Sequence, residues 1–239
     1  MASVNTWPIE RLLRAIFRKK SLVGDGVYFD KKDFPITKVL EDNYAVIKAE
    51  LEPLMQRVVD FTPFQDISPD QTYISNDDKW KMFFLKAGTF RLKKNCAQVP
   101  KTMAILDQHR NVVSAYFSVL GPRKMLMPHE GPWCGIIRIH LGMQIPRQGK
   151  GCVLVCGEQE YRWEEGKAVV FDDTYEHIAV NMTDSNRVVL FLDYMRPLPW
   201  PWNWLNWMVL KAGRFLPYFR APIRRHKVWE QKFYAQGET

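Results

Sequence analysis

The sequence predicts a mainly β protein, and three observations lead to this prediction. From residue 111 onward the chain is a series of short β-branched or aromatic runs, among them VVSAYFSVL, GCVLVCG and RVVLFLDYM. Clusters of Gly, Pro, Asn and Asp separate these runs at intervals of about eight to twelve residues, a spacing typical of an antiparallel sandwich or barrel. An apolar content of 46% and a charged content of 25% are ordinary for a globular protein.

The part of the chain before these runs has apolar side chains at helical spacing. Over residues 7–18 (WPIERLLRAIFR) the spacing predicts an amphipathic basic helix, and over 35–58 it predicts a second helix. The prolines and aspartates of residues 60–71 indicate a loop. Residues 79–92 are typical of a strand, a turn and a returning strand, and 95–109 should contain a short helix.

A chain of 239 residues is long enough to bury a substantial core. We expect one compact domain with three regions. These are a helical support region over residues 1–78, a β core that carries the site over 79–197, and a Trp-rich basic C-terminal arm over 198–239.

Positive charge and tryptophan gather near the two ends of the chain. The net charge is +8, with basic clusters at residues 11–20 and 220–227 and the run WPWNWLNW at 200–207. This balance favours an anionic partner, either nucleic acid or a membrane surface. Trp beside Lys and Arg suits a membrane interface, and no recognised nucleic-acid module is present, so we expect an anionic membrane surface and no nucleic acid. Alternatively, the ends pack on the domain or on a second subunit, and the oligomeric state stays open.

Cysteine usage and hydropathy bear on the compartment. The four cysteines (Cys96, Cys134, Cys152 and Cys156) form no CxxC pair and follow no secretory signal peptide, so we expect reduced thiols rather than a disulfide framework. No stretch of about 20 uncharged apolar residues occurs, and no spanning helix is expected. The expected location is the cytoplasm, peripheral on the inner face of the membrane.

Two histidines are the candidate metal ligands. His129 and His177 each lie at the end of an apolar strand beside turn residues, which places both at the rim of a barrel. A single histidine is usually structural, but two at one rim can bind one ion, and neutral imidazole suits Fe(II). A carboxylate ligand would normally stand two residues after the first histidine, where this chain has Gly131. Glu130 should point to the opposite face.

The cations of the same stretch indicate an anionic ligand. Arg187 begins an apolar strand that should be buried on both faces, and a buried guanidinium requires an anion such as a carboxylate. Arg138 and His140 alternate with apolar residues, so both should share one face of a strand. The alternative is a set of internal salt bridges with nearby acids, namely Asp172, Asp173, Glu176 or Asp193. Asp172 and Asp173 have two equally supported interpretations: carboxylates that orient the His177 ring, or turn residues before the strand.

The residues from Trp80 to Pro197 resemble the aspartyl/asparaginyl β-hydroxylase family of Fe(II)- and 2-oxoglutarate-dependent dioxygenases. The matching segments are KWKMFFL, NCAQVPKT, SVLGPRKMLMPHEGP, IRIHLG, WEEGK, VFDDTYEH and the strand of the closing arginine. The continuous piece WEEGKAVVFDDTYEHIAVN is the most specific of them. The resemblance implies a double-stranded β-helix, or jelly-roll, core.

The resemblance also assigns site residues and cofactors. It implies His129 and His177 as the Fe(II) ligands, and Arg187 as the partner of the distal carboxylate of 2-oxoglutarate. Ser118, Arg138 and His140 would complete the cosubstrate pocket, and Trp80 would line it. Family members bind iron without a protein carboxylate, which agrees with Gly131. O2 is the second cosubstrate.

The chain ends favour one substrate class within this family. Some bacterial members hydroxylate acyl chains of membrane lipids, such as lipid A and ornithine lipids, and the aromatic and basic ends suit such a substrate. A β-hydroxylase of Asp or Asn in a protein is the alternative. A non-catalytic binding module on the same barrel is a second alternative, which iron-dependent succinate production would separate from an enzyme.

Overall fold

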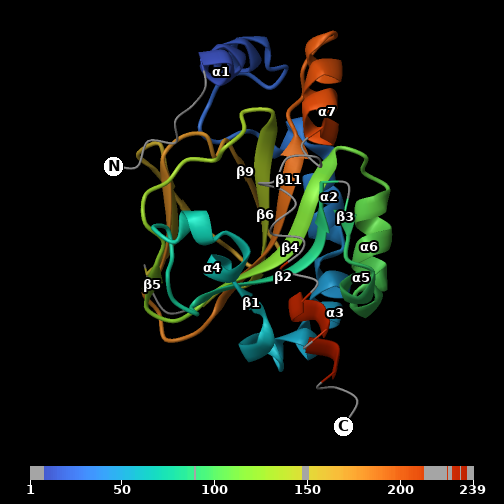
Figure 1. Ribbon diagram of the computed structural model, residues 1–239, viewed down its shortest axis with the longest axis vertical. Helices are drawn as coiled ribbons and strands as arrows, with labels where there is room; N and C mark the ends of the chain where they lie inside the picture. Colours follow the sequence, from blue (N-terminus) through green and yellow to red (C-terminus); the bar gives the residue numbers. More distant parts are fainter. Residues whose placement is uncertain are drawn as a thin grey trace.

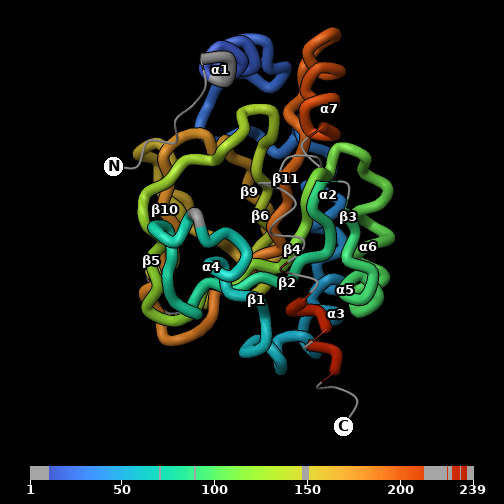
Figure 2. The backbone as a smooth tube through the Cα atoms, viewed as in Figure 1, coloured from blue at the N-terminus to red at the C-terminus, as the bar shows by residue number. Residues whose placement is uncertain are grey.

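The computed structural model describes residues 8–88, 90–146, 151–212, 225, 228–231 and 233–235. Two antiparallel sheets face each other, and helices cover the outer side of the larger sheet (Figures 1 and 2). From β4 to β11 the chain passes from one sheet to the other at each strand except at the β7–β8 hairpin, as in a double-stranded β-helix. The predicted mainly β jelly-roll core is therefore confirmed.

The large sheet has the order β1-β2-β4-β11-β6-β9, with β3 added beside β2, and the small sheet has the order β5-β10-β7-β8. The strands are β1 (Thr62–Pro63), β2 (Trp80–Ala87), β3 (Phe90–Arg91), β4 (Val112–Leu120), β5 (Lys124–Met125), β6 (Ile136–Gln144), β7 (Cys152–Cys156), β8 (Gln159–Arg162), β9 (Ala168–Phe171), β10 (His177–Asn181) and β11 (Arg187–Met195).

The described helices flank this core. They are α1 (Pro8–Lys20), α2 (Pro35–Asp42), α3 (Tyr44–Met55), α4 (Phe64–Ile67), α5 (Lys93–Gln98), α6 (Pro100–Asp107) and α7 (Trp202–Ala212), with 3-10 turns at Lys31–Asp33, Val58–Asp60 and Pro69–Gln71. Helices α1 and α7 lie at one end of the molecule, and the last described turns lie at the other, near α3 (Figure 1). Among the described helices, none combines the length and hydrophobicity that crossing a membrane requires.

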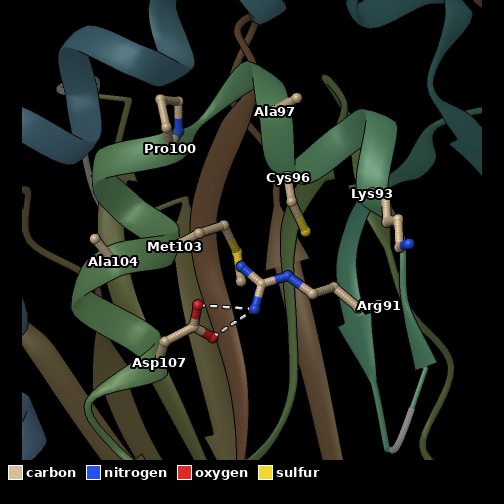
Figure 3. A pocket seen from close by; sticks show the side chains of 8 residues that line it. All are labelled: Arg91, Lys93, Cys96, Ala97, Pro100, Met103, Ala104 and Asp107. Atoms are coloured by element: carbon tan, nitrogen blue, oxygen red, sulfur yellow. Dashed lines mark hydrogen bonds and ion pairs between the residues drawn. The ribbon is translucent and has the colours of Figure 1, made fainter.

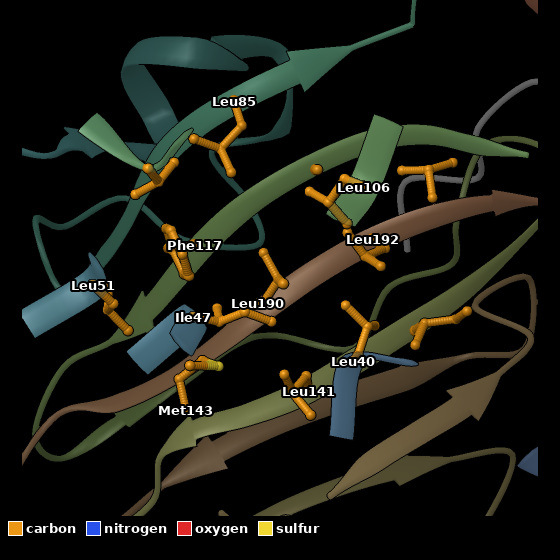
Figure 4. Packing of buried hydrophobic residues seen from close by; sticks show 14 of the residues in the cluster. Leu40, Ile47, Leu51, Leu85, Leu106, Phe117, Leu141, Met143, Leu190 and Leu192 are labelled. Atoms are coloured by element: carbon orange, nitrogen blue, oxygen red, sulfur yellow. The ribbon is translucent and has the colours of Figure 1, made fainter. Parts of the chain in front are cut away.

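Strand alternation separates the core from the site. On β6, Ile137, Ile139 and Leu141 face the helices and join one buried cluster with side chains of β4, β11, α2 and α3 (Figure 4). The intervening residues, Arg138 and His140, therefore face the space between the two sheets. This confirms the prediction that both share one face.

The helical region differs from the sequence prediction in two places. The helix expected over 35–58 is interrupted at Asn43, whose side-chain amide donates to the Val39 carbonyl and ends α2. The loop predicted over 60–71 is wrong in part, because it contains β1 and α4. Phe64 of α4 stacks on Trp80 at 4.0 Å between ring centroids, so tertiary packing orders a segment whose composition indicates a loop.

The C-terminal arm divides into two parts. Trp202–Ala212 forms α7, whereas Trp229 and Phe233 pack on Phe83 at the other end of the molecule, with centroid distances of 6.2 and 6.0 Å. The basic cluster 220–227 lies outside the described residues except for Arg225, which donates to the Ile67 carbonyl at 3.5 Å. The alternative in which the arm packs on the barrel thus holds for its last part. All four cysteines are buried and free.

Candidate active site

His129 and His177 lie directly opposite each other in an isolated antiparallel bridge. His177 N donates to His129 O at 2.9 Å, and His129 N donates to His177 O at 3.2 Å. Directly opposite residues of an antiparallel pair project to the same side, and the two ring centroids are 4.2 Å apart. Two residues that are 48 positions apart in the sequence are thus brought together by backbone pairing. The sequence places both at one rim of the barrel but does not predict this pairing.

Hydrogen bonds to backbone carbonyls fix the tautomer of both imidazoles. His129 Nδ1 lies 2.7 Å from the Met127 carbonyl, and His177 Nδ1 lies 3.0 Å from the Tyr175 carbonyl. A carbonyl only accepts, so each Nδ1 carries the proton and each Nε2 keeps its lone pair. Burial lowers the pKa of His129 to about 4, and burial together with His129 lowers the pKa of His177 well below 6.5. Both rings are therefore neutral at pH 7, the form that binds metal.

Arg187 is a buried cation with no carboxylate partner among the described residues. It begins β11, is 2% exposed, and its Nε and Nη1 atoms have no hydrogen-bond partner. Its guanidinium carbon lies 4.6 Å from the centroid of Trp163, a residue that the sequence analysis did not select. Burial lowers the pKa of Arg187 to about 10, so it remains charged at pH 7. A buried unneutralised cation is a site for an anion.

His140 of β6 is close enough to both Arg187 and His177 for their charges to lower its pKa. Its ring contacts Phe171 and Phe191 at centroid distances of 5.0 and 4.6 Å, and both ring nitrogens are buried without a partner. Burial, followed by Arg187, lowers its pKa well below 6.5. His140 is thus a neutral group with one N–H donor and one acceptor available to a ligand.

Trp80 of β2 and Ser118 of the neighbouring strand β4 are joined by a hydrogen bond. Trp80 Nε1 donates to Ser118 Oγ at 3.1 Å, and both residues are buried. Because α4 places Phe64 on the indole, the position of Trp80 is fixed by packing and by a hydrogen bond. The Ser118 hydroxyl proton remains available to a ligand.

Arg138 has internal carboxylate partners. Its Nη2 lies 2.8 Å from Asp173 Oδ2 and 3.4 Å from Asp193 Oδ1, and its guanidinium stands 4.5 Å over the Phe191 ring. Burial opposes its charge, but the two carboxylates raise the pKa of Arg138 above its usual value. The internal salt bridges that the sequence left as an alternative therefore exist for this residue, and a role toward a cosubstrate stays a prediction.

Asp173 fills the space beside Gly131, where the third metal ligand would be expected. A Cβ at Gly131 would lie 1.9 Å from Asp173 Oδ2, and Gly131 N donates to Asp173 O at 2.6 Å. Burial raises the pKa of Asp173 to about 6. Glycine at 131 thus makes room for a carboxylate that comes from another loop.

Asp172 stabilises the turn before His177 through hydrogen bonds from Thr174. It does not contact the His177 ring, whose Nδ1 donates to the Tyr175 carbonyl. One carboxylate oxygen accepts from Thr174 N and Oγ1 at 3.0 and 2.6 Å, and the other accepts from the fully buried Arg196. Of the two interpretations of Asp172, the turn residue is the one that the structure supports. The role of Arg196 is not predicted from the sequence, although a single arginine directly after an apolar strand is a usable signal.

The donor set fits a two-histidine metal centre. Within the described residues, no group of three or more His, Cys, Asp or Glu side chains could hold a metal ion. His129 and His177, with their ring centroids 4.2 Å apart, are the candidate donors of a two-ligand site. A separate hollow of about 370 Å³ lies between β3, α5 and α6 (Figure 3). Its Arg91 and Asp107 neutralise each other at 2.7 Å, and it includes none of the candidate site residues.

Comparison with known proteins gives the family. The family described as Aspartyl/Asparaginyl beta-hydroxylase matches residues 41–197, more than half of the chain. The ornithine lipid ester-linked acyl 2-hydroxylase of Rhizobium tropici is 38% identical over 221 residues, which are 92% of this chain and 79% of that protein. The human aspartyl/asparaginyl beta-hydroxylase is 28% identical over 167 residues, which are 68% of this chain but 21% of that protein, so the chain spans about a fifth of its length.

Among solved structures, an oxidoreductase of the 2OG-Fe(II) oxygenase family from Burkholderia pseudomallei covers 50% of this chain and 66% of its own, with a TM-score of 0.38 and 9% identity. The sequence match over residues 41–197 includes every candidate site residue, from Trp80 to Arg187. The chain therefore belongs to the aspartyl/asparaginyl β-hydroxylase family, whose members are hydroxylases.

Proposed function

We propose that the chain is an Fe(II)- and 2-oxoglutarate-dependent dioxygenase that hydroxylates an acyl chain of a membrane lipid. One observation carries the cosubstrate assignment. A neutral histidine pair with both Nε2 atoms available shares the space between the sheets with Arg187, which has no carboxylate partner in the part of the chain that the structure describes. Metal, cosubstrate and O2 together supply the oxidation, in which 2-oxoglutarate becomes succinate and CO2 while one oxygen atom enters a C–H bond.

The side chains have separate tasks in this mechanism. His129 and His177 would hold Fe(II), and their backbone-bonded Nδ1 atoms fix the ring orientation. Arg187 would bind the distal carboxylate of 2-oxoglutarate by a charge-assisted contact. Ser118 and His140 would donate hydrogen bonds to the same molecule, with Trp80 as one wall of its pocket. Arg138 would contribute positive charge while it remains paired with the two aspartates.

The interior charge favours a lipid over an acidic side chain as substrate. Among the described residues, the other buried cations have carboxylate partners: Lys124 pairs with Asp77 at 3.0 Å, and Arg196 pairs with Asp172. Arg187 thus supplies charge for one dicarboxylate, and an aspartate substrate would need a further cation. The identity of 38% to an ornithine lipid acyl 2-hydroxylase over most of the chain supports the same choice.

The surface at the α1–α7 end suits contact with a bilayer. We define the α1–α7 surface by its exposed residues, which are Arg11, Leu12, Lys19, Lys20, Trp200, Trp204, Trp207, Met208 and Lys211. Trp200 is 81% exposed, and α7 carries no acidic residue. Exposed tryptophans among lysines and arginines match a headgroup region with anionic lipids. A peripheral position on the inner, cytoplasmic face of the membrane is part of this proposal.

Turnover of 2-oxoglutarate tests the chemistry. We expect succinate production with added Fe(II), and loss of succinate production in His129→Ala and His177→Ala with the fold retained by circular dichroism. Metal bound through Cys152 and Cys156 in place of the histidines would refute the assignment. If the wild-type protein produces no succinate in an iron-dependent reaction, the non-catalytic binding module becomes the favoured interpretation.

Lipid mass spectrometry tests the substrate. Cells with the protein should contain membrane lipids with one added oxygen on an acyl chain, and cells with His177→Ala should not. An added oxygen on Asp or Asn of a protein, without change in the lipids, would establish the alternative, which the likeness to the human β-hydroxylase motivates.

Vesicle co-sedimentation tests the membrane contact. We expect the protein to bind anionic vesicles at low salt and to be released by salt. A chain ending near Pro199 is an unsuitable control, because Trp229 and Phe233 pack in the core. Trp204→Glu with Trp207→Glu removes only exposed side chains. Equal binding by this double variant would refute the role of α7.

A further inference from the structure

We propose that α1 positions the two loops that carry His129 and His177, and that binding of the α1–α7 surface to an anionic bilayer tightens the metal site. The inference rests on the proposed function for the identity of its partner, a bilayer with anionic headgroups. Its structural basis is a chain of contacts that runs from both helices into the segments 129–135 and 172–177.

Arg14 of α1 contacts both segments at once. Its Nη1 donates to Glu130 Oε2 at 2.9 Å and to Thr174 O at 3.4 Å. Glu130 follows His129 directly, and Thr174 lies in the turn before His177. The Arg14–Glu130 pair is partly exposed, so it is weak by itself, and its importance lies in joining two loops through one side chain.

Arg18, one turn further along α1, contacts the turn before His177 more closely. Its Nη2 donates to Thr174 Oγ1 at 2.9 Å, and its guanidinium carbon lies 4.1 Å from the centroid of the Tyr175 ring. The Tyr175 carbonyl is the group that accepts from His177 Nδ1. Arg18 therefore holds the residue that orients the His177 imidazole, which makes Arg18 a positioning residue.

A buried network continues this connection to the other histidine loop. Thr174 Oγ1 donates to Asp172 Oδ1, and Asp172 Oδ2 pairs with Arg196. Arg196 Nε in turn donates to the Cys134 carbonyl at 2.6 Å. The contact made by Arg18 thus reaches the segment that follows His129.

Helix α7 rests on the same segment. Asn206 is fully buried, donates to Gly135 O at 2.7 Å, and accepts from Trp133 Nε1 at 3.0 Å. Phe17 of α1 contacts Trp133 and Trp202 at centroid distances of 5.8 and 6.4 Å, which joins the two helices.

The outer sides of α1 and α7 form the α1–α7 surface, and their inner sides contact the segments around the histidines. Leu12 is 59% exposed and Trp204 is 55% exposed, whereas Phe17 and Asn206 of the same helices are fully buried. A bilayer that restrains the outer side therefore restrains the inner contacts. The positive charge of this surface identifies anionic headgroups as the complementary partner.

Metal affinity of the full-length protein tests this coupling without reference to turnover. Co(II) binding is measured by calorimetry in the absence of O2, alone, with phosphatidylglycerol vesicles and with phosphatidylcholine vesicles. We expect phosphatidylglycerol alone to tighten binding, and hydrogen exchange to slow in segments 129–135 and 172–177. Arg18→Ala should weaken Co(II) binding about tenfold and remove the vesicle effect, since groups that orient a ligand affect metal affinity by about 10- to 100-fold.

Three further variants control the interpretation. Leu12→Glu with Trp204→Glu should keep the Co(II) affinity of the free protein but lose the response to vesicles. Arg91→Ala, which removes an ion pair with Asp107 outside the site, should behave as wild type. If Arg18→Ala does not fold, Arg18→Lys tests the same contact and should give intermediate affinity.

Two results would overturn the coupling. One is wild-type Co(II) affinity and loop exchange in Arg18→Ala, and the other is vesicle binding that leaves Co(II) affinity unchanged. Failure of the proposed substrate is a separate outcome, because a protein that responds to vesicles but adds no oxygen to lipids would retain the coupling and lose the substrate assignment.

Discussion

Arg187→Met is the substitution that most directly separates a ligand-binding cation from a structural one. The guanidinium is 2% exposed, has two nitrogens without hydrogen-bond partners, and has Trp163 as its aromatic neighbour. Methionine keeps an unbranched apolar side chain of similar reach and removes the charge. The free protein should lose no stability and can gain some, because a buried charge without a partner opposes folding.

The effect on 2-oxoglutarate should have the opposite sign. Removing one member of a buried, hydrogen-bonded charge pair costs about 2–5 kcal/mol, much of it the penalty on the carboxylate that remains. At about 1.4 kcal/mol per tenfold change, this corresponds to an increase in Kd of roughly 30- to 4,000-fold. The variant therefore combines an intact fold with a severe binding defect.

Thermal unfolding measures both quantities in one experiment. At a 2-oxoglutarate concentration of about 100 times the wild-type Kd, in the presence of Co(II) and without O2, the wild-type protein should gain about 2.7 kcal/mol. At the same concentration the variant should gain about 0.9 kcal/mol or less. Trp163→Phe is a matched control, since it keeps the charge and changes only its aromatic neighbour.

Either of two results would refute the reasoning. If Arg187→Met binds 2-oxoglutarate as the wild type does, the cation is not the cosubstrate anchor. If the ligand-free variant is several kcal/mol less stable than the wild type, Arg187 has a structural partner and its charge is not reserved for a ligand.

Three further predictions follow from the same region. Gly131→Asp should weaken metal binding in calorimetry and destabilise the fold by about 1–3 kcal/mol, because its Cβ would lie 1.9 Å from Asp173 Oδ2; tighter metal binding would contradict this. Burial lowers the pKa values of the site histidines, so the metal-free protein should lose stability as pH falls below about 6.5, where the unfolded chain takes up protons first. In urea unfolding, the His140→Phe variant should lose less stability over this pH range than the wild type. An unchanged pH dependence would show that His140 does not contribute to the loss. Arg196→Met should cost about 3–5 kcal/mol in denaturant unfolding by leaving Asp172 unpaired, and addition of Asp172→Leu should recover part of that loss.

The strands and the site residues could be predicted from local sequence because their signals are local. A period of two, as in IRIHL, fixes which side chains share a face wherever the strand lies in the sheet, so Arg138 and His140 could be placed inside together. Proline and glycine marked the ends of most strands. The loop prediction over residues 60–71 was wrong in part because the signal there is not local. The order of this segment comes from Phe64 packing on Trp80, and local composition cannot predict a contact with a residue distant in the sequence.

The sequence by itself determined the β-rich core and the family resemblance, and it predicts which histidines and arginines form the candidate site. Only the tertiary structure decided their surroundings. It pairs His129 with His177 through the backbone, and it places Asp173 in the space beside Gly131. It also gives Arg138 two carboxylate partners and Arg187 none among the described residues. It also decided that α1 and α7 meet at the loops of the site. The physical reason is that residue type and periodicity set which face a side chain occupies, whereas its partners, its burial and therefore its charge state depend on segments brought together from far along the chain.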